Sequence, residues 1–302
     1  MAHFTTMTPE ALERWTTARH LNRYAGKRAA RVYTKVNNVE SSDGAFEEEW
    51  EVSGLGTLSL IPEGTAVAYD QPVQGNRTRI THRKFGLGYR VTEEMQQDDK
   101  WRVVSRMADD LLDSCEDHRE RLGHAIWNDA FTGTTYTGLD AVALCATTHT
   151  SLKGGGTRSN AAATPADLAP ESVEALLSQA RLTVDDQGRY LDFKPRTLFC
   201  HTNNEWEAQR IFESTQRPGT ADNDINTMNR LGMSMIFSPY LTDTDMFILL
   251  DLASSDIKFY DRIKPTTKVG TDFDTSDMKT KLTYRAGVGF YSWGGVFGSA
   301  GA

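Results

Sequence analysis

The sequence predicts an α+β fold, and the order of its elements carries that prediction. An acidic, strand-like hairpin comes first, and one very long amphipathic helix follows it. A compact stretch then alternates helices with strands, and the chain ends in a strand-rich return. At 302 residues the chain is long enough for two closely connected domains.

Residues 8–35 are predicted to form a basic helical arm. Thr8 is a suitable N-cap and Pro9 follows at the first helical position, with apolar residues at helical spacing after them. Seven basic and two acidic residues give this segment a charge of +5. The first residues of the chain have no apolar core or small-residue cleavage site, so we do not expect a signal peptide.

Residues 36–64 have the opposite charge, −7, because they contain seven Asp and Glu residues and no Lys or Arg. The strings FEEEWEV and LGTLSLIPEG are strand-like and contain glycines, so we expect an extended hairpin with few core-forming residues. Five basic residues then accompany the alternating run at 77–90. Blocks of opposite sign suit a protein that binds copies of itself, because charge complementarity steers association. Three solvated faces that differ in sign by accident are the alternative.

The long helix is predicted over residues 98–131, from apolar residues spaced by three, four and seven. At 1.5 Å per residue it would be about 50 Å long. Its apolar positions do not continue as heptads, so we expect a spine that lies across a sheet rather than a coiled coil. Its charged face, which includes Glu116, Arg119 and Glu120, must be wet or contact something polar.

Residues 132–165 are rich in Gly, Thr and Ala and predict a flexible connection, since KGGGT lacks the GxxxxGK[ST] frame of a phosphate-binding loop. Two helices are then predicted from PESVEALLSQARLTV, with Pro170 near its start, and NNEWEAQRIFES, capped by Asn203 or Asn204. RTLFCHT, MSMIFSPYL and MFILLD predict strands, and the stretch from IKFYDRIK onward predicts antiparallel strands around Gly and Asp turns.

The composition argues against several classes of protein. A net charge of −8 argues against a dedicated nucleic-acid binder. The three cysteines share no short spacing, which predicts neither a disulfide framework nor a zinc knuckle and fits synthesis in a reducing cytosol. No apolar run approaches the ~20 residues of a membrane span, so no membrane partner is expected.

No catalytic or metal-binding motif is found, and no cofactor is expected. His118 and His124 are six residues apart on one predicted helix and so lie on different faces. His149 lies close in sequence to Cys145 and Asp140, but a nucleophile and base cannot be deduced from such proximity.

Two clusters of aspartates faintly resemble metal-binding loops. Asp243 and Asp245 form one, and TDFDTSD forms the other with Asp272, Asp274 and Asp277. Neither has the Gly and terminal Glu of an EF-hand, and both lie between strand-like segments. Turns are the favoured interpretation, because Asp is a common turn former.

Several local strings carry a resemblance to a known family. They are RVTEEMQQDD before the long helix, GLDAVALCATTHTSLKGGGTRSN, DDQGRYLDFKPRTLFCHTNNEWEAQRIF and NTMNRLGMSMIFSPYLTDTDMFILLD. With the order of elements, they resemble the major capsid proteins of tailed bacteriophages with the Hong Kong 97-type fold, particularly the Mu-like major head subunit group. The resemblance extends from about residue 30 to residue 297.

The resemblance implies a capsid fold with four parts. These are an N-terminal arm (1–35), an extended loop hairpin (36–80), a peripheral domain (81–165 and 256–302) with its spine helix (98–131), and an axial domain (166–255).

The implied function is self-assembly, as hexamers and pentamers, into the icosahedral shell that encloses the phage genome. The protein would not be an enzyme, and would assemble in the host cytoplasm and reside in the virion capsid. Portal and scaffolding proteins are implied partners, as is a decoration protein where one exists. A separate scaffolding protein is expected, because the recognisable body starts almost at once. Packaged double-stranded DNA would bind only weakly, through the arm. The alternatives are an encapsulin-like compartment shell or another virion structural protein, and more distantly a hydrolase.

The charge blocks supply candidate contacts between subunits, in which the acidic loop would lie against basic residues of a neighbour. The acidic candidates are Glu47, Glu48, Glu49 and Glu51. The basic candidates are Arg77, Arg79, Arg83 and Lys84, together with Arg23 and Arg28 in the arm. No lysine and asparagine can be matched to the covalent cross-link of some relatives, so no cross-link is assigned.

Overall fold

The computed structural model describes residues 31–97, 101–153, 156–216 and 225–302. The chain divides into two compact units, each built from separate stretches of sequence. Unit 1 comprises the described parts of Met1–Ala45, Thr81–Gly123 and Phe259–Val288. Unit 2 comprises the described parts of Phe46–Ile80, His124–Lys258 and Gly289–Ala302.

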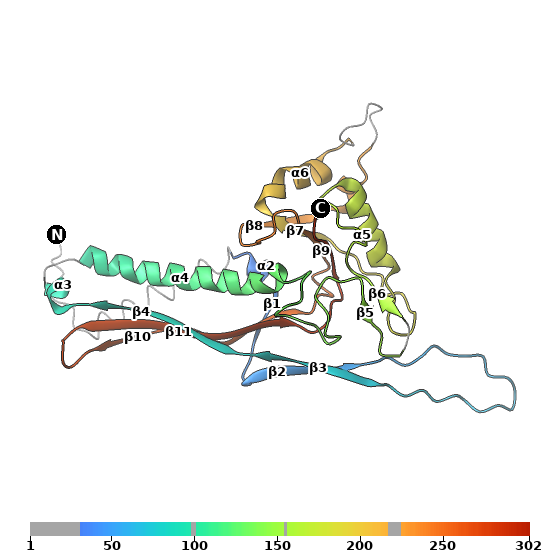
Figure 1. The fold of residues 1–302 in the computed structure, drawn as a ribbon, viewed down its shortest axis with the longest axis horizontal. Coiled ribbons are helices and arrows are strands. Elements are labelled where there is room, and N and C mark those ends of the chain that lie inside the picture. Colours follow the sequence, from blue (N-terminus) through green and yellow to red (C-terminus); the bar gives the residue numbers. More distant parts are fainter. Residues whose placement is uncertain (1–30, 98–100, 154–155, 217–224) are drawn as a thin grey trace. The chain divides into compact units, whose positions relative to one another are not determined.

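Unit 1 is built on a four-stranded sheet, with a long helix packed along one face of it (Figure 1). The strands, in spatial order, are β1 (Asn38–Ser41), β10 (Ile257–Thr271), β11 (Met278–Phe290) and β4 (Arg83–Val91). The helices are α2 (Tyr33–Val36), α3 (Glu93–Gln97) and α4 (Trp101–Asn128), of which the last turn belongs to unit 2. β11 pairs antiparallel with β4, from Met278 opposite Val91 to Ala286 opposite Arg83.

The predicted spine helix is confirmed as α4, a helix of 28 residues that lies on the sheet. Residues 98–100, where it was predicted to begin, lie outside the described residues. It ends at Asn128 rather than near residue 131. Asp129 explains the earlier end, because its carboxylate accepts hydrogen bonds from the backbone N–H groups of Thr134, Thr135 and Tyr136. These bonds turn the chain away from the helix axis.

Unit 2 is centred on a second four-stranded sheet. Its order is β12 (Val296–Ser299), β9 (Phe247–Leu250), β7 (Thr197–His201) and β8 (Ser234–Ser238). β7 is parallel to β8 and antiparallel to β9. The helical elements are α5 (Pro170–Leu182), η1 (Thr202–Asn204), α6 (Glu205–Glu213) and η2 (Met228–Leu231). Two small sheets pair β2 (Phe46–Val52) with β3 (Gln74–Thr81), and β5 (His149–Thr150) with β6 (Thr157–Arg158).

The core of unit 2 explains why its strands are continuous apolar runs. All four residues of β9 and of β12 are buried. α5 and α6 pack against this sheet through residues such as Leu176 and Ile211. A strand that is covered on both faces does not alternate apolar and polar residues. The predicted helices at PESVEALLSQARL and EWEAQRIFE and the predicted strands at RTLFCHT, MSMIFSPYL and MFILLD are thereby confirmed.

Two local predictions are wrong and one cannot be assessed. The string LGTLSLIPEG forms no strand: β2 ends at Val52, β3 begins at Gln74, and all residues between them are described. Asn204 occupies the N-cap position of α6, but its side chain makes no cap bond and donates to the Thr244 carbonyl at 3.0 Å. Most of the predicted arm at 8–35 lies outside the described residues. None of the described helices is both long and apolar enough to cross a lipid bilayer.

Candidate subunit interface

One face of the β2–β3 hairpin carries charges that pair within the chain. The Glu48 carboxylate lies 3.7 Å from the Arg77 guanidinium and is hydrogen-bonded by Nε of Arg79. The guanidinium of Arg77 lies 5.5 Å from the Trp50 ring centroid, and that of Arg79 lies 3.9 Å from the Phe46 ring centroid. Alternate residues of a strand share a face, so these side chains form one cross-strand layer. Three of the predicted contact residues, Glu48, Arg77 and Arg79, are therefore brought together inside one subunit.

The opposite set of alternate positions on β2 is acidic. Glu47, Glu49 and Glu51 occupy it, of which Glu49 is exposed and the other two are half-buried. Burial raises the pKa of Glu51, and the nearby carboxylates of Asp140 and Asp186 raise it further. We call Glu47 and Glu49 the acidic pair of the hairpin.

Residues 53–73 connect β2 to β3 and expose large hydrophobic side chains. Leu58 is 102% exposed, and Leu60 and Tyr69 are each 94% exposed. Leu55 and Val67 are more than half exposed. Exposed apolar groups at this density are typical of an interaction surface. We refer to this segment as the hairpin tip.

The hairpin tip is held by polar contacts to the rest of unit 2. The Lys153 ammonium donates to both oxygens of Asp70, at 2.8 and 2.6 Å. Asp70 also accepts from the Gly56 N–H at 2.7 Å, and Gln187 donates to the Gly54 carbonyl at 3.2 Å. The bond from Lys153 is the main reason that the pKa of Asp70 lies below its usual value.

The remaining basic candidates lie at the start of β4 and in the arm. Arg83 and Lys84 are both exposed, and as neighbours in a strand they point to opposite faces of the sheet. Arg23 and Arg28 lie outside the described residues.

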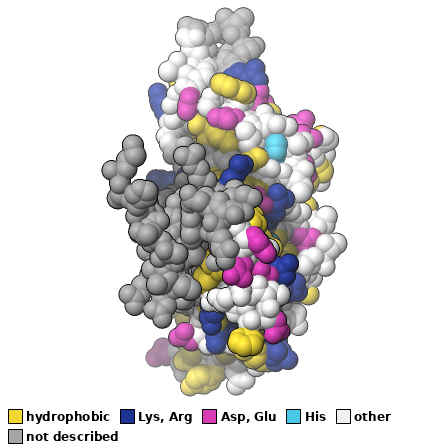
Figure 2. Space-filling model, turned by 90° about the vertical axis from the view of Figure 1, so that its left-hand side faces the viewer, with side chains coloured by type: hydrophobic (Ala, Val, Ile, Leu, Met, Phe, Trp, Pro, Cys, Tyr) yellow, Lys and Arg dark blue, Asp and Glu magenta, His cyan; other side chains and the backbone are white. Residues whose placement is uncertain are grey.

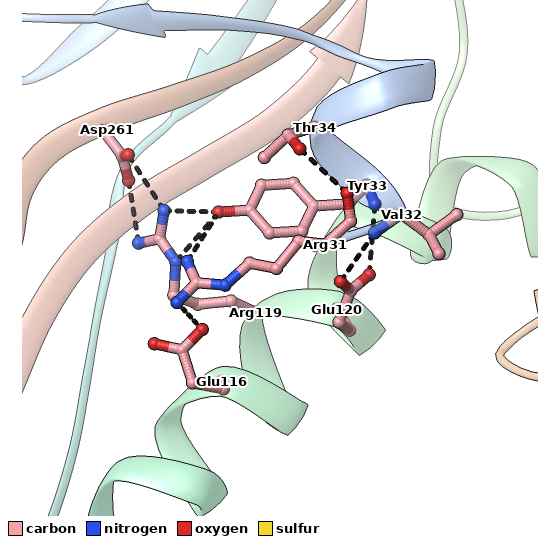
Figure 3. A network of polar contacts seen from close by, with 8 residues as sticks. All are labelled: Arg31, Val32, Tyr33, Thr34, Glu116, Arg119, Glu120 and Asp261. Carbon is pink, nitrogen blue, oxygen red and sulfur yellow. Dashed lines mark hydrogen bonds and ion pairs between the residues drawn. The ribbon is translucent and has the colours of Figure 1, made fainter. Parts of the chain in front are cut away.

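A buried network of charged groups holds the start of the described chain to α4 in unit 1 (Figure 3). The Arg119 side chain is fully buried, donates a hydrogen bond of 2.9 Å to the Asp261 carboxylate and forms an ion-pair contact of 2.8 Å with its other oxygen. Its guanidinium also donates to the Tyr33 hydroxyl at 2.8 Å. Arg31 forms an ion pair with Glu116 in the same cluster.

Glu120 completes this attachment by capping α2. Its carboxylate accepts from the backbone N–H groups of Val32 at 2.9 Å and Tyr33 at 3.1 Å. Burial raises the pKa of Glu120 in spite of these bonds. Part of the charged face of α4 therefore contacts polar groups rather than water, and the network holds residues 31–33 against α4.

The residues considered for catalysis have structural partners. His149 is buried, and its Nδ1 lies 2.5 Å from Asp140, as a base and its orienting acid would. Its Nε2, however, faces the amide oxygen of Asn160 at 2.9 Å, where a nucleophile would be required. The amide nitrogen of Asn160 donates to two carbonyls, so its oxygen is the atom that faces the ring. Burial raises the pKa of the Cys145 thiol far above its usual value, which keeps it protonated.

The aspartate clusters form turns, as predicted. Asp243 accepts from the N–H groups of Asp245 and Met246, at 3.0 and 3.4 Å. Asp272 accepts from the Asp274 N–H at 3.2 Å and is paired with Lys279.

Comparisons with known proteins agree with a role in assembly. The sequence model of a family described as "Phage capsid protein" matches residues 75–298, which is more than half of the chain. The chain belongs to the phage capsid protein family. It is a major capsid protein, a structural protein that self-assembles to form the shell of the virion.

The fold of this capsid protein is also found in solved capsid structures. The capsid of an empty GTA particle superposes with a TM-score of 0.56 at 11% identity, over 88% of each chain. The capsid of cyanophage P-SCSP1u gives 0.57 at 12% identity, over 87% of this chain and 85% of the other. Mycobacterium phage Adephagia gives 0.56 at 11% identity, over 89% of each. No curated protein matches the sequence. At such identities the superpositions establish the mixed helix and strand fold alone.

The hairpin tip of this capsid protein is the part of the candidate interface that sequence reasoning missed. Its signal was the set of large apolar residues in LGTLSLIPEG, which was interpreted as a strand. A strand needs a neighbour to bond its backbone, whereas these residues are held through side chains and a few loop contacts.

Proposed function

We propose that this capsid protein assembles, through hexamers and pentamers, into an icosahedral shell of the Hong Kong 97 type around a packaged phage genome. The role is structural and not catalytic. Shells would assemble in the host cytoplasm, with a separate scaffolding protein and a portal protein as partners. Decoration proteins and a weak contact between the arm and DNA belong to the same proposal.

The observation that carries the proposal is the exposed apolar hairpin tip. Leu58, Leu60 and Tyr69 together would expose a large apolar area in a lone subunit. Burying these side chains against a neighbouring subunit would stabilise the contact by about 25 cal/mol for each Å² of apolar area removed from water. A shell repeats one contact in every subunit, so a modest gain per copy stabilises the whole assembly.

We assign the parts of the chain accordingly. The extended loop (36–80) includes β2, the tip and β3. The peripheral domain (81–165 and 256–302) includes α4 and the strands β4, β10 and β11, whereas β1 of the same sheet falls in the range of the extended loop. The axial domain (166–255) includes α5, α6 and most of the second sheet. The arm is 1–35. The residue ranges come from the family resemblance, and the element order of the chain supports them.

A hairpin-tip variant tests the proposal. In Leu58→Ser/Leu60→Ser, we expect subunits with the circular dichroism spectrum of the unaltered protein that form no closed shells in negative-stain micrographs. The matched control is Leu182→Ser/Leu191→Ser, which alters two exposed leucines elsewhere in unit 2, 66% and 44% exposed. The control is expected to assemble. Closed shells at normal yield from the tip variant would contradict the proposal.

A further inference from the structure

The sheet of unit 1 has one face against α4 and a second face, which we call the open face. Asp261 of β10 accepts a hydrogen bond from Arg119 of α4, so the odd-numbered positions of β10 point toward the helix. Tyr284 of β11 and Phe85 of β4 both contact His118 of α4. The open face therefore carries the even-numbered positions of β10 and β4 and the odd-numbered positions of β11.

The pairing of β4 with β11 brings two cations together on the open face. Arg90 lies opposite Lys279, and one step further along the same face Gly88 lies opposite Lys281. All three charged side chains are exposed. Like charges that are directly opposite in neighbouring strands repel. Arg90 and Lys279 are the first such pair, and we call them the turn pair.

The β10–β11 hairpin supplies a second pair of like charges. At its turn the Asp272 N–H donates to the Asp277 carbonyl at 2.9 Å, which fixes the register of the two strands. Counting back from these residues along both strands sets Lys268 opposite Lys281, and both lysines are exposed. We call Lys268 and Lys281 the lysine pair.

Carboxylates at the turn neutralise the turn pair alone. Lys279 pairs with Asp272, and Arg90 lies 3.4 Å from Asp277. Figure 2 looks at the end of unit 1 that holds this turn, and shows Lys and Arg side chains beside carboxylates there. The lysine pair has no carboxylate within ion-pair distance in the described part of the chain. Its positive charge is therefore left for a ligand to neutralise.

The lysine pair lines a groove with a bare floor. The groove has a volume of about 680 Å³, within the usual range for a small-molecule site, and is also lined by Gly88, Arg90 and Gly270. Gly88 lies beside Lys281 in the neighbouring strand. Nothing lies within 4 Å of the point where a Cβ of Gly270 would stand. Glycines let a ligand approach the backbone closely, so an anion can reach both ammonium groups.

Phosphate matches this arrangement better than a carboxylate does. A phosphate group carries a charge of about −1.5 to −2 and three strong acceptor oxygens, so one group can neutralise the lysine pair. A carboxylate supplies a single charge. Opposite residues of neighbouring strands are only about 4.5–5.5 Å apart at their Cβ atoms, so both ammonium groups can donate to the same phosphate. The guanidinium of Arg90 can bind the oxygens of a second phosphate through two parallel N–H groups.

We propose that this groove binds an anion with several phosphate groups, with Lys268 and Lys281 as its principal contacts. Arg90 and Lys279 extend the site toward the turn. The chemistry is shared by a free oligophosphate and by the backbone of a nucleic acid. The inference goes beyond shell assembly and does not depend on it.

Isothermal titration calorimetry of the full-length subunit with tripolyphosphate tests the site. Lys268→Gln/Lys281→Gln should weaken binding by at least about tenfold, because two charge-assisted contacts are lost. The matched control is Lys35→Gln/Arg106→Gln, which removes two exposed cations of α2 and α4 and should bind as the unaltered protein does.

The thermal midpoint without ligand separates loss of binding from loss of folding. Lys268→Gln/Lys281→Gln removes a repulsion between like charges, so its midpoint should equal or exceed that of the unaltered protein. A lower midpoint would contradict the repulsion from which the site is inferred.

Two further titrations identify the source of the phosphate groups. If a short DNA duplex binds more tightly than tripolyphosphate, with the same loss in Lys268→Gln/Lys281→Gln, the site takes a nucleic-acid backbone. The reverse order shows a site for a free oligophosphate, and either result supports the inference. Tighter binding of an oligoglutamate peptide than of both would overturn it in favour of an acidic protein.

Two simpler results would also overturn the inference. One is the absence of measurable binding of tripolyphosphate. The other is equal affinity of the unaltered protein and Lys268→Gln/Lys281→Gln, which would show that these lysines are only solvated. None of these results would affect the proposed function, which fails only if the unaltered protein, with its scaffolding partner, forms no shells.

Discussion

The buried network around Arg119 offers the sharpest test of what holds unit 1 together. Asp261 and Arg119 are almost completely removed from water, with side chains 3% and 0% exposed. A hydrogen bond of 2.9 Å and an ion-pair contact of 2.8 Å join them. In Asp261→Asn the shape is kept, but the guanidinium loses its opposing charge. Removing one partner of a buried ion pair costs about 3–5 kcal/mol. The Tyr33 hydroxyl still accepts from Arg119, so we expect about 3 kcal/mol, at the low end of that range.

The measurement is the free energy of unfolding of the unassembled subunit in urea, monitored by circular dichroism. Asp117→Asn is the control, since Asp117 lies on the same helix, 2.7 Å from Arg121, with both side chains well exposed. An exposed pair of that kind is worth about 0.3–0.5 kcal/mol. A second comparison is Arg119→Met/Asp261→Leu, which removes both charges and should be less destabilising than Asp261→Asn alone.

A loss of less than about 1 kcal/mol in the free energy of unfolding of Asp261→Asn, the scale of a surface pair, would contradict this role of the network. A lower stability of Arg119→Met/Asp261→Leu than of Asp261→Asn would contradict it as well. Either result would mean that the network is solvated and does not hold residues 31–33 to α4.

Two further predictions concern unit 2. Phe199 is fully buried, and the centroid of its ring lies 5.3 Å from that of Trp127. Phe199→Ala leaves a cavity there and should lower the free energy of unfolding by about 3–5 kcal/mol in the same urea assay. A loss below about 1 kcal/mol would contradict this packing. Asp129 is buried, yet the hydrogen bonds that it accepts from Thr132, Thr134 and the following N–H groups hold its pKa well below the usual value. The stability that the Asp129 carboxylate contributes is therefore present above about pH 4 and is lost as the pH falls further. At pH 6, the thermal midpoint of Asp129→Asn should therefore be lower than that of the unaltered protein. Between pH 4 and pH 2.5, the midpoint of the variant should fall by less. Identical pH profiles of the two proteins would rule this role out.

Much of the element order was predictable because it depends on local patterns. PESVEALLSQARL has helical periodicity and a proline at its start, and FILL is too apolar for anything but a buried element. Apolar residues that recur every three, four or seven positions over a long stretch likewise predicted the single helix α4. Its C-terminus was misplaced because Asp129 ends it through groups five to seven residues further on. Periodicity carries no information about such a bond.

The candidate interface was predictable in charge but not in pairing. The sequence shows acidic and basic blocks, and the natural hypothesis sets all of them against a neighbour. In the structure Glu48 is already paired with Arg77 and Arg79, because the hairpin places residues some thirty positions apart side by side.

The sequence by itself determined the α+β order, the long helix, the buried strands and the uneven charge, because periodicity, propensity and composition act within a few residues. Only the tertiary structure decided which charges pair inside the subunit, as Glu48 does with Arg79. That decision depends on strand pairing and on which face a helix covers, and both are set by residues far apart along the chain.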